Sequence, residues 1–242
     1  KKIKASGEEL FNEFYSDVFK ERWPALKESL LEPKKFVLLA PEHLGYPTEN
    51  LKSFFDLPFL FEMEEEIRDQ NDKCYFLDGA SALAPMLLEV KPGEKVLDLC
   101  AAPGGKAILL GLQLQGEGEL VANDKSPNRR GRLKNVLETY LPQDFYQNHV
   151  RVTGHDASSW CLHETEAYDK ILLDAPCSSE KHVLESPKHL AEWKVGRTKK
   201  LAALQWTMLA SAWLVLKKGG RLVYSTCSIS PLENDQVVEK LM

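Results

Sequence analysis

Two kinds of reactive side chain, carboxylates and thiols, follow short apolar runs in this sequence. The carboxylates are those of Asp98, Asp124, Asp156 and Asp174. The thiols stand among turn-forming residues, Cys177 after Asp174-Ala175-Pro176 and Cys227 after Ser225-Thr226. A carboxylate accepts hydrogen bonds from hydroxyls and amines, and a thiolate forms covalent bonds with substrates. The pattern therefore indicates a polar ligand site together with a nucleophile.

An aspartate after a strand often only caps the next helix, and a cysteine is often a small buried apolar residue. Both alternatives stay open for each residue taken alone. Several acids at the carboxyl ends of successive strands, however, meet at one edge of a parallel sheet. Asp124, after the second strand, is the candidate for ribose hydroxyls, and Asp156 is the candidate for an adenine amine. Cys177 and Cys227 would open into one pocket.

The stretch KVLDLCAAPGGK, residues 95–106, predicts a strand, a tight turn and the start of a helix. Val96, Leu97 and Leu99 suit a buried parallel strand, which Pro-Gly-Gly cannot continue. Glycine tolerates positive φ and lets a ligand approach the backbone, and free N–H groups at a helix start favour anionic groups. The spacing matches neither G-x-G-x-x-G nor G-x-x-x-x-G-K-[ST]. We predict a nucleotide-type pocket without dinucleotide or triphosphate binding; a plain connection is the alternative.

The elements that must position these residues alternate between strand and helix from Lys95 onward. This rhythm predicts an α/β fold with a doubly wound, mainly parallel Rossmann-like sheet. The expected later strands are 119–123, 150–153, 170–173 and 222–225, and the expected helices are 128–141 and 198–216, the second ended by Gly219 and Gly220.

The residues before Lys95 predict a smaller, partly helical region. Apolar spacing predicts a helical extension over 6–31 with a capped start and a second helix opened by Pro24. Residues 41–61 look like a connector, 62–66 form an acidic run, and 76–90 are expected to be a helix. We predict a helical extension and connector over 1–74 and the main domain over 75–242.

Composition narrows the class of protein. The formal charge of −5 disfavours non-specific coating of nucleic acid, although a local basic groove stays possible. No apolar run approaches the roughly 20 residues of a membrane span, and no signal-peptide region is present at the start. The chain begins without Met, which leaves room for an upstream targeting segment. The cysteines lack a disulfide framework, and Cys161, His163, His182 and His189 fit no zinc spacing, so reduced thiols and no metal are expected.

Three ordered motifs resemble the signature of the Sun-type (Nol/Nop/Sun) RNA cytosine-5 methyltransferases. They are CAAPGGK at 100–106, DAPC at 174–177, and Thr226-Cys227-Ser228 followed by Glu233-Asn234. The resemblance covers about residues 75–238, and Tyr75-Phe76-Leu77-Asp78 with Asn123-Asp124 is similar to the mitochondrial ribosomal-RNA branch. It implies a class I methyltransferase domain that methylates carbon 5 of cytosine in RNA with S-adenosyl-L-methionine. It implies rRNA as substrate, with tRNA as the alternative.

The resemblance also assigns cofactor contacts. The methionine end of the cofactor would be wrapped by Cys100, Ala101, Ala102, Pro103, Gly104, Gly105 and Lys106. Asp124 would bind the ribose and Asp156 the adenine, while Arg129 and Ala157 match further family contacts. Asp174 would stand between cofactor and base. In this family two strands normally follow the last helix, so the end at Met242 suggests a clipped domain.

The chemistry explains the thiols. Carbon 5 of cytosine is a poor nucleophile until another nucleophile adds at carbon 6, which a thiolate does well. In family members acting on RNA the Thr-Cys cysteine attacks, which assigns Cys227 as the nucleophile and Cys177 as the residue that helps release the product. Asp174 would hydrogen-bond or protonate ring N3.

The substrate base must be unstacked, so single-stranded or loop RNA is expected. Two basic clusters could guide it, Lys125, Arg129, Arg130, Arg132 and Lys134, and Lys194, Arg197, Lys199 and Lys200. Since no RNA-binding module is recognisable, we expect help from a protein partner or a preassembled particle. We expect an intracellular protein without membrane contact, mitochondrial if eukaryotic and otherwise cytoplasmic.

Competing functions stay open. A non-catalytic RNA-binding or assembly factor could retain this fold. Methylation of a small molecule or a protein needs no paired thiols, and a cysteine hydrolase would need a histidine related to Cys177 or Cys227.

Overall fold

The computed structural model describes residues 6–63 and 72–242, and its chain forms two compact units. The first unit contains the described part of Lys1–Pro33 together with Ala175–Ala210 and Ser225–Met242. The second contains Lys34–Asp174, apart from 64–71, and Ser211–Tyr224. The expected domain boundary after residue 74 stays a prediction. Residues 64–66 of the expected acidic run lie outside the described residues.

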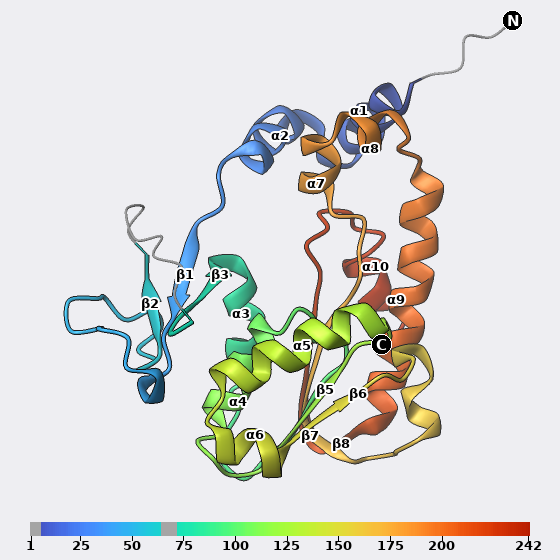
Figure 1. Ribbon diagram of the computed structural model, residues 1–242. Coiled ribbons are helices and arrows are strands. Elements are labelled where there is room, and N and C mark those ends of the chain that lie inside the picture. The colour runs from blue at the N-terminus through green and yellow to red at the C-terminus, as the bar shows by residue number, and fades with distance from the viewer. Residues whose placement is uncertain (1–5, 64–71) are drawn as a thin grey trace, which may run out of the picture. The chain divides into compact units, whose positions relative to one another are not determined.

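The second unit is built on a five-stranded sheet, of which β5, β6, β7 and β8 are labelled in Figure 1. Its strands are β4 (Lys95–Asp98), β5 (Glu119–Asn123), β6 (Val150–Thr153), β7 (Tyr168–Asp174) and β8 (Leu216–Ser225), in the order β6-β5-β4-β7-β8. Strand β5 pairs in parallel with β4 and β6, and β4 pairs in parallel with β7. The predicted sheet is therefore confirmed. The chain order reverses beside β4, which is where ligands bind in open sheets of this kind.

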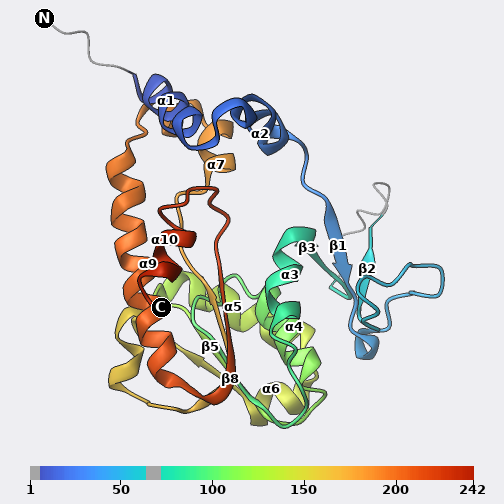
Figure 2. The ribbon, with the colours of Figure 1, turned by 180° about the vertical axis from the view of Figure 1, so that it is seen from behind.

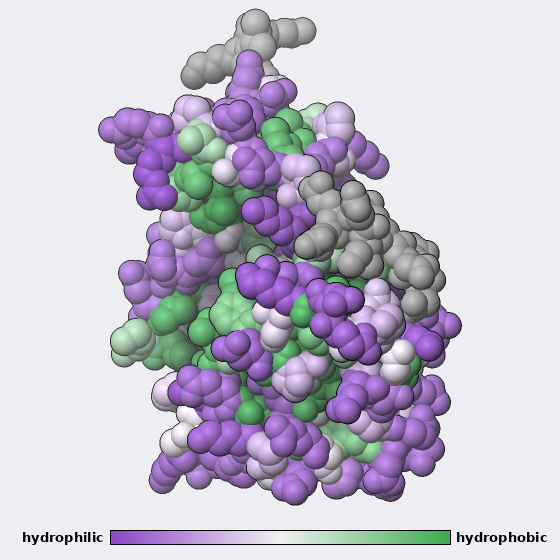
Figure 3. Space-filling view, turned by 90° about the vertical axis from the view of Figure 1, so that its left-hand side faces the viewer, coloured by the Kyte–Doolittle hydropathy of each residue, from purple (hydrophilic) through white to green (hydrophobic). Residues whose placement is uncertain are grey.

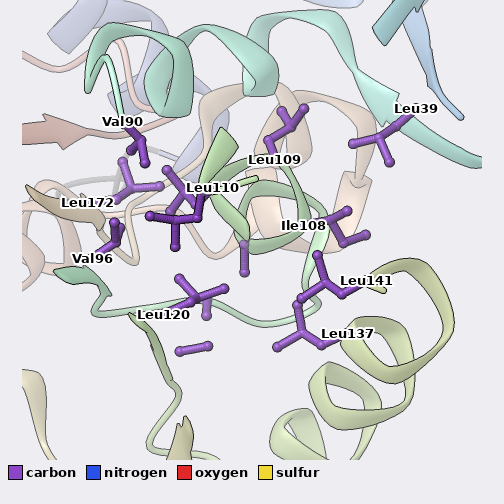
Figure 4. Close-up of a cluster of buried hydrophobic side chains, with 14 of the residues drawn as sticks. Leu39, Val90, Val96, Ile108, Leu109, Leu110, Leu120, Leu137, Leu141 and Leu172 are labelled. Carbon is purple, nitrogen blue, oxygen red and sulfur yellow. The ribbon is translucent and has the colours of Figure 1, made fainter. Parts of the chain in front are cut away.

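The helices of the second unit bury apolar side chains in the core of this unit. They are α3 (Gly79–Leu87), α4 (Gly105–Gln113), α5 (Pro127–Tyr140), α6 (Gln143–His149) and the 3-10 helix η3 (Ala157–Leu162). Figure 4 shows Ile108, Leu109 and Leu110 of α4 among the side chains of Leu120 and Leu137, and all five are fully buried. Burial of each such side chain contributes roughly 1.5–3 kcal/mol, so this core fixes the turn that begins α4.

A small antiparallel sheet precedes the main one. It consists of β1 (Phe36–Leu39), β2 (Leu60–Glu62) and β3 (Tyr75–Asp78) in the order β2-β1-β3. The helix expected over 76–90 was wrong at its start, because 75–78 pair with β1 and helix α3 begins at Gly79. The connector expected over 41–61 contains the short 3-10 helix η2 (Glu42–Leu44) and ends in the buried residues Leu60 and Phe61, so its end belongs to the core. Figure 2 shows α3 and α4 beside each other, in agreement with their many mutual contacts.

The first unit is mainly helical. It contains α1 (Gly7–Phe19), η1 (Lys20–Arg22), α2 (Trp23–Leu31), α7 (Glu180–Glu185), α8 (Pro187–Ala191) and α10 (Asp235–Glu239), and α9 (Val195–Val215) contributes its residues up to Ala210. Ser6 and Glu9 form the predicted capping box of α1. An aromatic cluster of Phe11, Tyr15, Trp23 and Trp193 forms the core.

The long helix predicted over 198–216 ends before the two glycines that were expected to stop it. Helix α9 ends at Val215, whereas Gly219 and Gly220 lie within β8, so the glycine stop expected there was wrong. Gly219 instead has φ of 77°, which lets the backbone turn inside the strand segment.

None of the helices in the described ranges is long and apolar enough to span a membrane. Hydrophilic side chains cover much of the face shown in Figure 3.

Candidate active site

The carboxylate of Asp98, the last residue of β4, is buried and only half satisfied. The side chain is 1% exposed, Oδ1 accepts a hydrogen bond from the Cys100 N–H at 3.3 Å, and Oδ2 has no partner among the described residues. Burial raises the pKa of Asp98 to about 7, the charge of Asp174 adds to this, and Lys106 partly opposes it. The free oxygen could accept a hydrogen bond from a ligand.

Asp124 and Arg129 connect the loop after β5 to the turn after β4. Asp124 Oδ1 accepts from the Ser126 N–H at 2.9 Å, and Oδ2 lies 3.2 Å from Arg129 Nη1. The same guanidinium donates to the carbonyl oxygen of Ala102. Three residues expected to contact the cofactor are thus brought together.

The glycine turn is fixed by its backbone and by packing. Gly104 has φ of 127°, and a Cβ there would lie 2.6 Å from Cγ1 of Val136. A Cβ on Gly105 would lie 2.8 Å from Cδ1 of Leu77. The expected positive φ is confirmed for Gly104 only. Both glycines therefore let neighbouring elements approach closely.

Ion pairs neutralise the other two acids. Lys106 Nζ lies 2.8 Å from Oδ2 of Asp174. Asp156 pairs with Lys125 and accepts from the N–H and hydroxyl of Ser158 at 3.0 and 2.7 Å, which lowers the pKa of Asp156 to about 2. Asp156 also caps η3, and Ala157 behind it is buried, so the capping alternative holds for Asp156 whether or not it also binds a ligand.

Asn123 joins three loops and was not singled out as a site residue from the sequence. Its amide donates to the carbonyl oxygens of Leu99 and His155 at 3.0 and 3.1 Å, and its Oδ1 accepts from the Thr153 hydroxyl and the His155 N–H. The side chain is 1% exposed. A polar residue ending an apolar strand was the only signal that could have revealed it.

The two thiols lie in contact within the first unit. Cys177 Sγ and Cys227 Sγ are 3.0 Å apart and share a hydrogen bond. That hydrogen bond and burial raise the pKa of Cys177, whereas Cys227 is exposed to solvent. The expectation that the two sulfurs share one location is confirmed; their chemical roles stay a prediction.

Two fully buried glutamates lie behind the thiol loops. Glu233 accepts from the Ser178 N–H at 3.0 Å, from Gln205 Nε2 at 2.7 Å and from the hydroxyls of Ser178 and Ser228. In the sequence Glu233 stands out only as part of the third motif, which predicted no role for its side chain.

Glu180 connects the same loops to the N-terminal helix. It accepts from the Tyr15 hydroxyl at 2.6 Å, from the Ile229 N–H at 3.0 Å and from the Ser178 hydroxyl. Burial and the charge of Glu180 raise the pKa of Tyr15, so its hydroxyl stays protonated and donates. Helix α1 is thus part of the support of the thiol loops.

Among the remaining candidate residues, the basic ones either form hydrogen bonds within the protein or are exposed to solvent. In the first basic cluster Arg130 donates to the carbonyl oxygens of Asp124 and Lys125, whereas Arg132 and Lys134 are exposed. In the second cluster all four side chains are exposed: Lys194, Arg197, Lys199 and Lys200. Within 6–63 and 72–242 no group of three or more His, Cys, Asp or Glu side chains could hold a metal ion.

A parallel sheet whose strands end in aspartates around a glycine turn defines a Rossmann-like methyltransferase fold, and solved structures agree. A methyltransferase homologue from Pyrococcus horikoshii matches with a TM-score of 0.73 and 26% identity, over 96% of this chain and 77% of that one. The fold of NSun6 from the same organism matches with a TM-score of 0.75 at 20% identity, over 96% of this chain and 86% of that one.

Residues 85–242 match the family model described as 16S rRNA methyltransferase RsmB/F, and the chain belongs to this family. The bovine protein called 5-cytosine rRNA methyltransferase NSUN4 is 34% identical over 276 residues, 95% of this chain and 72% of the relative. The mouse mitochondrial tRNA (cytosine(34)-C(5))-methyltransferase is 32% identical over 96% of this chain and 74% of its own length. The match to mouse NSUN4, at 43% identity, covers only 44% of that protein. The resemblance to the Sun-type family is confirmed.

Proposed function

We propose that this chain transfers a methyl group from S-adenosyl-L-methionine to carbon 5 of a cytosine in rRNA, through a covalent bond to Cys227. The observation that carries the proposal is the 3.0 Å separation of the two sulfurs, because this chemistry uses one thiol to attack and one to help release the product. Family membership and the names of the bovine and mouse relatives support the reaction class. The mouse relative acts on tRNA by its name and is nearly as similar, so tRNA is the second candidate substrate.

The residues of the second unit fit the cofactor. Asp98 Oδ2 is buried without a partner among the described residues, which suits a ligand that carries a hydrogen-bond donor or a positive charge. Residues 100–106 would hold the methionine end, Asp124 the ribose hydroxyls and Asp156 the adenine, with Arg129 and Ala157 beside them. When bound, S-adenosyl-L-methionine supplies an electrophilic methyl group.

The two thiols have different roles in the proposed reaction. The raised pKa of Cys177 keeps its proton in place, so it can donate a hydrogen bond to the sulfur of the exposed Cys227. Cys227 as thiolate bonds to carbon 6 of the ring, which moves the electron pair of the 5,6 double bond to carbon 5. After carbon 5 has been methylated, a general base takes its proton, the C–H electron pair re-forms the 5,6 double bond, and the bond between carbon 6 and Cys227 breaks to return the thiolate. Asp174, paired with Lys106, is the candidate to hydrogen-bond ring N3.

RNA contacts are proposed for the exposed basic residues. Lys194, Arg197, Lys199 and Lys200 precede or begin α9 in the same unit as the thiols and suit contacts to phosphates. The overall charge of −5 leaves a need for a protein partner or an assembled particle to supply affinity. Because the mouse tRNA relative carries the word mitochondrial in its name, we propose a mitochondrial location in a eukaryote and a cytoplasmic one otherwise.

The test uses RNA that contains 5-fluorocytidine, because fluorine cannot leave as the carbon 5 proton does and the adduct persists on denaturing gels. The unchanged protein and Cys177→Ala should trap RNA, Cys227→Ala should not, and Cys161→Ala is the matched control. Trapping by Cys227→Ala but not by Cys177→Ala would reverse the assignment. Methyl transfer to isolated rRNA and tRNA distinguishes the two substrates, and cofactor binding without transfer to any RNA would favour a non-catalytic assembly factor.

A further inference from the structure

Glu233 contacts the loops that carry both cysteines. Its Oε2 accepts from the Ser178 N–H at 3.0 Å, and Ser178 directly follows Cys177. Its Oε1 accepts from the Ser228 hydroxyl at 3.1 Å, and Ser228 directly follows Cys227. One fully buried carboxylate therefore joins the two segments at equivalent places.

Gln205 of α9 strengthens this connection from the side of Cys177. Its Nε2 donates to Glu233 Oε2 at 2.7 Å and to the carbonyl oxygen of Pro176 at 2.9 Å. Both acceptors fix which end of the amide faces them, and Gln205 is fully buried. Pro176 and Ser178 flank Cys177, so its backbone is held on both sides.

The loop of Cys227 is held by hydrogen bonds of its own that lead back to Glu233. Ser228 Oγ, which donates to Glu233, accepts from the Ser230 N–H at 3.0 Å, and the Ser228 N–H donates to Thr226 Oγ1 at 3.1 Å. A displacement of Ser228 would therefore move the turn that contains Cys227.

We propose that Glu233 is a positioning residue that sets the separation of the Cys177 and Cys227 sulfurs, with Gln205 as its anchor. The role rests on the proposed function, since it matters for catalysis only if the two thiols act on one substrate base. A carboxylate suits it because its two oxygens accept several hydrogen bonds at once, and its donors are uncharged groups of the two cysteine loops and of α9. Removing it leaves the Ser178 N–H and the Gln205 amide without this acceptor in a buried place, so the loops should shift.

The first measurement needs no RNA. Phenylarsine oxide forms two As–S bonds with a close pair of thiols and releases water. A competing dithiol removes the arsenic again. The dithiol concentration that this requires reports how firmly the protein holds the two sulfurs at bridging distance. Cys177→Ala and Cys227→Ala establish that the captured arsenic bridges this pair. Glu233→Ala should release the arsenical at about tenfold less dithiol, Glu233→Gln should stay within about threefold, and the exposed Glu239→Gln is the matched control.

The second measurement is kinetic. Misplacement of a reacting group by about 1 Å can cost about 100-fold, so Glu233→Ala should lower kcat by that order and leave KM for S-adenosyl-L-methionine unchanged. The glutamine variant should recover most of kcat, since its amide oxygen can take the Ser178 N–H and its NH₂ can donate to the serine hydroxyls. A purely structural role would not separate kcat from KM in this way.

Retention of the arsenical and wild-type kcat by a folded Glu233→Ala would overturn the proposal. If Glu233→Ala does not fold, Gln205→Ala takes its place with a smaller shift in the same direction, and wild-type retention by that variant overturns the proposal equally. Weakened retention in a protein that methylates no RNA would refute the proposed function and leave the positioning role intact. Methyl transfer at an unchanged rate in Glu233→Ala would refute the positioning role and leave the proposed function intact.

Discussion

Replacing Asp98 by Asn should stabilise the protein relative to the unchanged chain, and increasingly so as the pH rises. The carboxyl is fully buried, and its pKa is raised to about 7 by burial and by the charge of Asp174. An amide has the same shape and carries no charge. Its oxygen can keep the hydrogen bond from the Cys100 N–H, so the variant removes mainly the charge.

The sign follows from where the proton is bound. Between about pH 4 and pH 7 the unfolded chain has lost the Asp98 proton while the folded chain retains it, so the free energy of unfolding falls as pH rises. Each pH unit in this window is worth about 1.4 kcal/mol. From pH 5 to pH 8 the unchanged chain should therefore lose about 2 to 3 kcal/mol that the Asp98→Asn variant keeps.

Urea unfolding at pH 5 and pH 8, followed by circular dichroism, measures this difference directly. Asp17→Asn, at an aspartate on α1 whose side chain is 80% exposed, is the control and should show no such trend. A gap between the Asp98→Asn variant and the unchanged chain that stays constant from pH 5 to pH 8 would refute the account of Asp98 as a buried, partly protonated acid.

Three further outcomes are expected. Gly104→Ala should cost about 2 to 4 kcal/mol in unfolding free energy, because a Cβ at φ of 127° would meet Val136, and Val136→Ala in the same chain should recover part of it. Tyr15→Phe should cost about 1 to 3 kcal/mol, since it removes the hydroxyl that donates to the buried Glu180, and should leave the unfolding m-value unchanged. Asp156→Asn should remove less than about 1 kcal/mol, present above about pH 4 and lost as pH falls toward about 2, because the Asp156 side chain is 34% exposed and solvent screens its ion pair; acid titration of unfolding checks this.

The parallel sheet and its acids could be predicted because their signals are local. Val96 and Leu97 form an apolar run too short for a helix and too continuous for a half-exposed strand, and Asp98 ends it. The glycine turn then fixes where the chain reverses. Two cysteines that follow strands of one sheet were expected at one location for the same reason, and they are in contact.

The small antiparallel sheet and the buried glutamates could not be predicted, because they depend on contacts between residues that are far apart in the sequence. Strand β1 has only four residues, and its partner β3 lies 36 or more positions further along, so neither run could be assigned without the other. Glu180 and Glu233 look like solvated surface residues in the sequence, since glutamate is seldom buried. The hydroxyl that helps satisfy Glu180 belongs to Tyr15, 165 residues away.

The first unit draws on the beginning, the middle and the end of the chain, and this has a consequence during translation. Residues 34–174, which carry four of the five main strands, leave the ribosome before the segment that contains Cys227. Domains tend to fold as soon as their residues emerge. A nascent chain thus carries most of its proposed cofactor site well before it carries Cys227, which leaves it unable to form the proposed bond to an RNA base until the segment with Cys227 has been synthesised.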